Sequence, residues 1–237
     1  MRFENRPNDA LRPVVIQTDI NPYAEGSCLI KCGNTHVLCT ATVDTNLPEW
    51  LNNSGKGWIT AEYALLPRST SKRVSRDNSL HSGRTQEIQR LIGRSLRAVV
   101  DLETLNGYQI LLDCDVLQAD GGTRTASVSG AFVALYIALK KMFEQGLISQ
   151  MPVREFIAAI SCGIKDGELL CDLDYGEDSS ADTDSNFVIT ETGRIVEIQG
   201  TAEKTPFSEA EFSGLLTLAK TGVKTLIQKQ KEALQIK

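Results

Sequence analysis

Strand-like segments interrupted by longer helical ones recur along the whole of this 237-residue chain. β-Branched residues and apolar residues at alternate positions predict strands at 14–18, 28–31, 37–43, 58–63 and 110–117, and again at 157–164, 168–173, 187–190 and 195–199. Apolar residues at helical spacing predict helices at 86–105 and 125–145, and one long or two broken helices at 208–234 with Ser208 as N-cap. This order favours one compact domain spanning residues 1–237, with two similar halves sharing a sheet as the other possibility.

The sequence predicts no membrane span. Its longest uninterrupted apolar run, residues 131–139, is far shorter than the ~20 residues that a membrane helix needs. Residues 1–17 lack the basic stretch and apolar core of a signal peptide, so a cytoplasmic protein is expected. The six cysteines form no C-x-x-C pair and lie mostly in apolar segments, which predicts buried, reduced thiols and neither a disulfide framework nor a zinc site.

Charge is distributed unevenly along the chain. The formal net charge of −5 argues against a general polyanion-coating role. Residues 68–97 nevertheless hold eight basic side chains against only Asp77 and Glu87. This basic segment is either a solvated loop or the electrostatic footprint of a nucleic-acid phosphate backbone.

The segment Gly121-Gly122-Thr123-Arg124-Thr125 joins a predicted strand to a predicted helix. Glycines let backbone amides approach an anion closely, the helix N terminus adds free N–H groups and positive potential, and Arg124 adds a bidentate guanidinium. The segment is neither a Walker loop, because no Gly-Lys-Ser/Thr follows, nor a G-x-G-x-x-G turn. Such a segment is either an ordinary glycine-rich strand-to-helix turn or a phosphate cradle.

A second arginine, Arg84, stands at the start of the other predicted helix, within the segment 81–85. A guanidinium at a helix N terminus is unfavourable against the macrodipole unless an anion lies between them. Arg84 is therefore a second candidate for holding an anion.

Six carboxylates fall within thirteen residues of the second half: Asp172, Asp174, Glu177, Asp178, Asp182 and Asp184. Like charges this close repel one another unless water or a cation separates them, and hard oxygen ligands suit Mg²⁺ or Mn²⁺. The cluster is either an acidic surface loop or a divalent cation site.

Histidine chemistry is not expected. His36 and His81 are the only histidines, and neither stands in a Ser-His-Asp or Cys-His arrangement. His36 lies in an alternating apolar strand and is predicted to be a packed residue. Any reaction should then use a nucleophile that needs no strong protein base, and the inorganic phosphate dianion, present at neutral pH, fits this requirement.

Several motifs together resemble one family. In chain order they are GWITAEY at 57–63, PRS at 67–69, GRTQEIQRLIGR at 83–94, QADGGTRTAS at 118–127, EDS at 177–179 and QGTAE at 199–203. Their order and spacing, from residue 5 to about residue 233, closely resemble the ribonuclease PH family. One departure is Ser185, beside Asp184, where the family usually has methionine.

The resemblance implies an α+β fold like that of ribosomal protein S5 domain 2, with mixed sheets and packed helices, assembled into a homohexameric ring as a trimer of dimers. It implies a reversible, phosphate-dependent 3′–5′ exoribonuclease, a tRNA nucleotidyltransferase that trims RNA 3′ ends, notably of tRNA precursors, and releases nucleoside diphosphates.

By position, the resemblance also assigns roles to individual residues. It implies that Asp178 and Asp184 are catalytic and hold Mg²⁺ or Mn²⁺. The implied phosphate ligands are Arg84, Gly122, Thr123 and Arg124. From the basic segment outside this cradle we expect three residues to bind the RNA backbone: Arg68, Arg73 and Arg76. Two other functions stay open, a hydrolytic metal-dependent exonuclease and a catalytically silent RNA-binding ring subunit.

Overall fold

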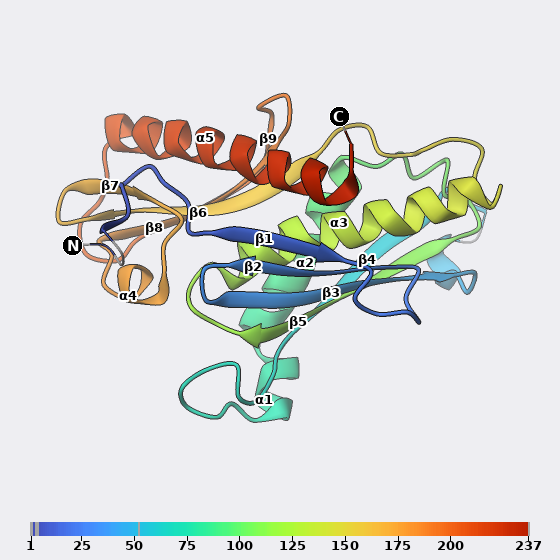
Figure 1. The fold of residues 1–237 in the computed structure, drawn as a ribbon, viewed down its shortest axis with the longest axis horizontal. Coiled ribbons are helices and arrows are strands. Elements are labelled where there is room, and N and C mark those ends of the chain that lie inside the picture. The colour runs from blue at the N-terminus through green and yellow to red at the C-terminus, as the bar shows by residue number, and fades with distance from the viewer. Residues whose placement is uncertain (1, 3–4, 52, 237) are drawn as a thin grey trace.

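The computed structural model describes residues 2, 5–51 and 53–236, which form two separate β-sheets (Figure 1). The first sheet contains β1 (Val14–Thr18), β2 (Gly26–Cys32), β3 (Thr35–Asp44), β4 (Trp58–Leu65) and β5 (Gln109–Gln118). Their order is β1-β2-β3-β5-β4. Neighbouring strands are antiparallel except β4 and β5, which run parallel because the chain between them returns through a helix.

The second sheet contains β6 (Ile157–Lys165), β7 (Glu168–Cys171), β8 (Thr183–Thr190) and β9 (Ile195–Ala202). Its order is β7-β6-β8-β9, and every neighbouring pair is antiparallel. Within the described residues the two halves of the chain therefore share no sheet, which corrects that alternative.

The helices are α1 (Arg76–His81), α2 (Gly83–Ala98), α3 (Thr123–Glu144), α4 (Tyr175–Asp178) and α5 (Glu209–Leu234), with a short 3₁₀ turn at Glu49–Leu51. α3 packs on β2 and β3 of the first sheet and on β6 of the second, so it joins the two sheets. α5 packs on β6, β7 and β1, and α2 covers β4. Figure 1 shows α5 along one outer side of the molecule, with α3 between it and the strands of the first sheet.

α3 owes its apolar composition to this central place. By length and composition alone it is apolar enough to cross a membrane, but 72% of its apolar window is buried inside the protein. Phe132, Leu135 and Leu139 are fully buried on it. The core therefore accounts for a hydrophobic helix of this kind.

The second helix, α2, differs from its prediction at both ends. α2 begins three residues before the predicted start, because the Ser82 hydroxyl caps it by accepting from the Thr85 N–H at 3.1 Å. It ends at Ala98, seven residues before the predicted end, because Val100 leaves the helix to form a bridge with Val153. The apolar spacing continued past the helix because the following turn also packs into the core.

The C-terminal helix is one continuous element, α5. The predicted cap at Ser208 is confirmed: its hydroxyl accepts from the Glu211 N–H at 3.2 Å, and the Glu211 carboxylate accepts from the Ser208 N–H at 2.6 Å. The six cysteines are all free thiols and all buried, as predicted.

Two strand boundaries in the second half bear on the site. β7 stops at Cys171 because Asp172 adopts a left-handed backbone conformation with φ of 57°. β8 begins at Thr183, four residues earlier than predicted, because residues 183–186 pair with both β6 and β9. Asp184 therefore lies in a central strand of the second sheet and not in a loop.

Candidate active site

Two helix N termini meet at one edge of the first sheet. β4 and β5 are parallel, with Leu65 opposite Val116, so their carboxyl ends lie at the same edge. α2 follows β4 and α3 follows β5, and both helices carry an arginine in their first turn. Each helix start contributes positive potential and free N–H groups, so this edge is suited to bind an anion.

The turn that begins α3 requires glycine. Gly121 and Gly122 have φ of 72° and 64°, which side chains rarely tolerate, and a Cβ on Gly121 would lie 2.6 Å from the Asp174 carbonyl carbon. The turn thus packs directly against the start of α4. No side chain caps α3. Thr123 in its first turn is held by the Tyr63 hydroxyl, 2.9 Å from the Thr123 hydroxyl.

The two arginines are held differently. The Arg124 side chain is 16% exposed, and its Nη1 donates to Gln199 Oε1 at 2.7 Å and to Glu87 Oε1 at 3.4 Å. Arg84 is exposed and makes no hydrogen bond or ion pair with the described part of the chain. Arg84 is therefore available for an anion, whereas Arg124 is already oriented.

The two carboxylates come from the second half. Asp178 is the last residue of α4 and Asp184 is the second residue of β8, and both are half-buried. Burial raises the pKa of both carboxyls, and for Asp184 burial and the Asp178 charge raise the pKa to about 6. Arg84 and Arg124 each lower the pKa of both aspartates, so all four side chains act on one another within one site.

The carboxylate pair fits a divalent cation. Asp184 Oδ1 is buried and has no hydrogen-bond partner among the described residues. A buried carboxylate oxygen left unpaired is costly, and a cation shared with Asp178 would satisfy it. The described residues hold no group of three or more metal-ligating side chains. Two carboxylates suffice for Mg²⁺, which retains waters and also binds substrate phosphates.

The other four carboxylates of the acidic segment have structural partners, so the six do not form one cation site. Asp172 pairs with Arg12 at 2.7 Å, and Glu177 pairs with Arg2 at 2.6 Å. Asp174 caps α4 by accepting from the Glu177 N–H at 2.8 Å, and Asp182 pairs with Lys204 at 2.7 Å. The cluster separates because basic side chains outside the segment pair with three of these four carboxylates.

The three basic residues expected to bind RNA lie in the segment that precedes α2. Arg68, Arg73 and Arg76 are exposed, and the chain around α1 projects from the body of the molecule (Figure 1). Arg76 is close enough to Asp115 to lower the pKa of that carboxyl, which burial raises. The segment is thus solvent-accessible and lies near the carboxyl end of β5.

Sequence reasoning missed residues that hold the site together. Gln199 orients Arg124, and Tyr63 supports Thr123. Both residues lie in the motifs quoted above, at 199–203 and 57–63, but spacing gives no sign that these strands reach the helix start. Arg12 was also missed, and its signal was weak because it lies in no motif quoted above.

The raised pKa of Asp184 predicts a pH-dependent loss of stability in the metal-free protein. The carboxyl has a pKa of about 6 when folded, against 3.8 normally, so between these values the folded state binds more protons than the unfolded state. The free energy of unfolding should therefore fall by roughly 2 kcal/mol as pH rises from 4 through 6 and stay reduced above that.

Urea unfolding with chelator at several pH values, on wild type and Asp184→Asn, measures this component. The asparagine variant should be the more stable protein above pH 6, and the difference should vanish near pH 4. Equal stability of the two proteins at pH 7 would contradict the assignment.

Both halves of the chain match models of one protein family. Domain 1 of the 3′ exoribonuclease family matches residues 10–141, and domain 2 matches residues 155–222. The chain belongs to the 3′ exoribonuclease family. The first match ends in the last turn of α3 and the second begins just before β6, where the first sheet gives way to the second.

Similar proteins specify the type within that family. The chain is 55% identical to a ribonuclease PH from Methylocella silvestris, over 99% of this chain and 100% of that one. It is 58% identical to a ribonuclease PH from Methylobacterium nodulans, with the same coverage. The expected resemblance to the ribonuclease PH family is thus confirmed.

Solved structures share the fold at lower identity. An Archaeoglobus fulgidus exosome with RNA bound to its active site matches with a TM-score of 0.79 and 24% identity, over 96% of this chain and 92% of that one. The α+β fold of mixed sheets with packed helices is therefore confirmed.

Proposed function

We propose that Arg84, the turn Gly122-Thr123-Arg124, Asp178 and Asp184 carry out the phosphorolytic 3′–5′ exoribonuclease reaction. Inorganic phosphate is one substrate and the 3′ end of RNA the other, and the terminal nucleotide leaves as a nucleoside diphosphate. The observation that carries the assignment is electrostatic. Two guanidinium groups, each at a helix start, act on the same two half-buried carboxylates.

The arginines overcome the repulsion between two anionic substrates. Two unit charges ~4 Å apart repel by about 4 kcal/mol at an effective dielectric of about 20, so phosphate and phosphodiester need cations between them. Arg84 and Arg124 supply two, and the uncapped first turn of α3 supplies N–H donors. Held there, phosphate lies in line with the terminal phosphodiester, and positioning provides most of the rate.

The bond changes balance without a protein nucleophile. A phosphate oxygen forms a new bond to the terminal phosphorus while the bond from phosphorus to the preceding O3′ breaks, and that O3′ takes up the proton that the hydrogen phosphate dianion gives up. Asp178 and Asp184 would hold Mg²⁺ or Mn²⁺, which when bound supplies positive charge to the leaving and equatorial oxygens. In reverse, the same groups add a nucleotide from a diphosphate.

The cellular setting is part of the proposal. We expect structured RNAs with 3′ tails, notably tRNA precursors, as substrates, a cytoplasmic location, and a homohexamer built as a trimer of dimers. We also expect residues 1–237 to act as a single domain. A core that runs continuously through both sheets supports the last expectation.

One incubation separates the possible activities. Protein, Mg²⁺ and a 3′-extended tRNA are mixed with and without phosphate, and the released nucleotide is identified by chromatography. Diphosphates that appear only with phosphate support phosphorolysis. Monophosphates without phosphate would indicate a hydrolytic exonuclease, and no release in either case would indicate a silent RNA-binding subunit.

The exposed basic residues of the segment before α2 should contribute to the binding of long RNA but not of a dinucleotide. Replacing Arg68, Arg73 and Arg76 together by alanine should raise the KM for a tailed tRNA about tenfold. The slope of log KM against log salt concentration should fall by about two. Activity on a dinucleotide should be kept, because it does not reach the segment. Steady-state rates at several salt concentrations measure both effects.

A charge-matched control removes Arg154, Arg194 and Lys220, which are exposed on the second half. This control should leave the KM for tailed tRNA near the wild-type value. An equal loss on tailed tRNA and on the dinucleotide in the basic-segment variant would argue against RNA-backbone binding.

A further inference from the structure

Three arginines near the N terminus are almost buried, although arginine normally keeps its charge in water. The side chains of Arg2, Arg6 and Arg12 are 7%, 8% and 7% exposed. We call these three residues the arginine clamp. None of them belongs to the phosphate cradle or to the carboxylate pair, and a buried guanidinium is stable only with fixed partners.

Arg12 joins two segments that are more than fifty residues apart in the chain. Its Nε and Nη2 donate to the Asp172 carboxylate at 3.1 and 2.7 Å, and its Nη1 donates to the Asp120 carbonyl oxygen at 2.6 Å. Asp120 directly precedes the Gly121–Gly122 turn, and Asp172 lies between β7 and α4. One planar guanidinium therefore connects the Gly121–Gly122 turn of the phosphate cradle, called the phosphate turn below, to the segment that leads to Asp178.

The surroundings of Arg12 fit a positioning role. A Cβ on Gly122 would lie 3.0 Å from Arg12 Nη2, so the guanidinium lies directly behind the turn. Asp172 has the left-handed conformation that ends β7, and its carboxylate also accepts from the Arg12 backbone N–H at 2.7 Å. Such a conformation persists only where its surroundings fix it.

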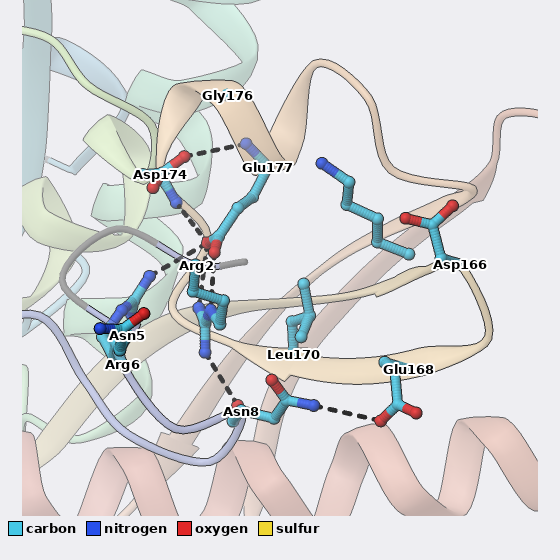
Figure 2. A pocket seen from close by; sticks show the side chains of 11 residues that line it. Arg2, Asn5, Arg6, Asn8, Asp166, Glu168, Leu170, Asp174, Gly176 and Glu177 are labelled. Atoms are coloured by element: carbon cyan, nitrogen blue, oxygen red, sulfur yellow. Dashed lines mark hydrogen bonds and ion pairs between the residues drawn. The ribbon is translucent and has the colours of Figure 1, made fainter.

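Arg2 and Arg6 extend the same tie to α4. Figure 2 shows Glu177 pointing from α4 toward both arginines at the wall of a pocket of about 950 Å³. Arg2 binds both Glu177 oxygens, at 2.6 and 2.9 Å, and Arg6 Nη2 binds Oε2 at 3.0 Å. Glu177 is the residue before Asp178 and completes the capping box of α4, so this contact fixes the helix that ends in Asp178.

We propose that Arg12 is a positioning residue for phosphorolysis, which holds the phosphate turn in register with Asp178, and that Arg2 supports it by fixing α4. The inference rests on the proposed function of the site. It assigns no contact with either substrate to the clamp. Its consequence is that loosening the clamp should impair the chemical step while the phosphate ligands themselves stay intact.

Arg12→Lys tests the central contact. Lysine keeps the positive charge beside Asp172, but its single ammonium cannot also reproduce the fork to Asp172 and the bond to the Asp120 carbonyl. We expect kcat to fall tenfold or more, with the KM for phosphate within threefold of wild type, at a temperature well below the Tm of the variant. The control is Arg194→Lys. Arg194 forms an ion pair with Glu155, and its side chain is 75% exposed. The control should leave both constants unchanged.

Arg2→Lys is a second, independent test, because Arg2 contacts Glu177 of α4 and not the phosphate turn. It should lower kcat threefold or more with no change in the KM for phosphate, and it decides the matter if Arg12→Lys does not fold. A kcat within threefold of wild type in each folded variant would overturn the inference, as would a rise in KM with unchanged kcat. Wild type is assayed beside them: if it releases no diphosphates, the proposed function fails instead.

Discussion

Replacing Arg124 by alanine should lower kcat/KM for phosphate about a thousandfold, the scale of an arginine that neutralises charge in phosphoryl transfer. Arg124 is the oriented member of the arginine pair, held by Gln199 and 16% exposed, so its guanidinium reaches the anion without losing further side-chain freedom. The turn before it rests on glycine geometry and on the contact between Thr123 and Tyr63. The variant should therefore fold with a near-native Tm.

Two further variants test whether the loss is specific to the Arg124 guanidinium. Arg124→Lys should recover only part of the loss, because an ammonium cannot bind Gln199 and an anion in the same forked geometry. Arg154→Ala removes an exposed arginine paired with Asp101 and should behave as wild type. Phosphorolysis of a short RNA at several phosphate concentrations gives the constants. An Arg124→Ala enzyme that keeps a tenth of the wild-type efficiency would contradict the role.

Replacing Asp184 by asparagine should separate catalysis from stability. The amide cannot carry the negative charge that a divalent cation requires, so kcat should fall at least about a hundredfold. Yet asparagine resembles the protonated carboxyl that burial favours at this position, so the metal-free variant should be more stable than wild type at pH 7. Loss of activity with a gain of stability is characteristic of a functional residue held at a structural cost.

Asp182→Asn is the matched control, because the same substitution two residues earlier affects a carboxylate paired with Lys204. It should leave kcat within twofold of wild type. Isothermal titration with Mn²⁺ adds a reading that is independent of turnover: the ion should bind wild type and Asp182→Asn but not Asp184→Asn. Wild-type turnover by Asp184→Asn would contradict the carboxylate assignment.

The sequence predicts the elements of this fold better than their arrangement. Alternating apolar residues locate the nine strands of the described residues, most of which bury side chains in the core, and the Ser208 cap marks the start of α5. Periodicity cannot show which strands pair, so it could not tell two sheets from one. Periodicity also extended the predicted helix at 86–105 beyond Ala98, the last residue of α2. It did so because Leu102 and Leu105, which lie in the following turn, continue the apolar spacing.

Some features of the site follow from local sequence, and others depend on contacts between distant parts of the chain. Glycines before a helix and an arginine inside it are local signals, but the residues alone left an ordinary glycine-rich turn open, and the phosphate role came from the family resemblance. The acidic segment was misleading as a unit, because the partners of Asp172 and Glu177 are arginines more than 150 residues away. The family resemblance named Asp178 and Asp184, and the fold shows that both carboxylates lie close enough to Arg84 and Arg124 to feel their charge.

A crystal structure of the protein grown with inorganic phosphate tests the central assignment most directly. We expect one tetrahedral anion within hydrogen-bonding distance of the guanidinium groups of both Arg84 and Arg124 and of the first amides of α3, on the side that faces Asp178 and Asp184. An anion bound by only one of the two arginines, or one separated from the aspartates by the body of the protein, would contradict it.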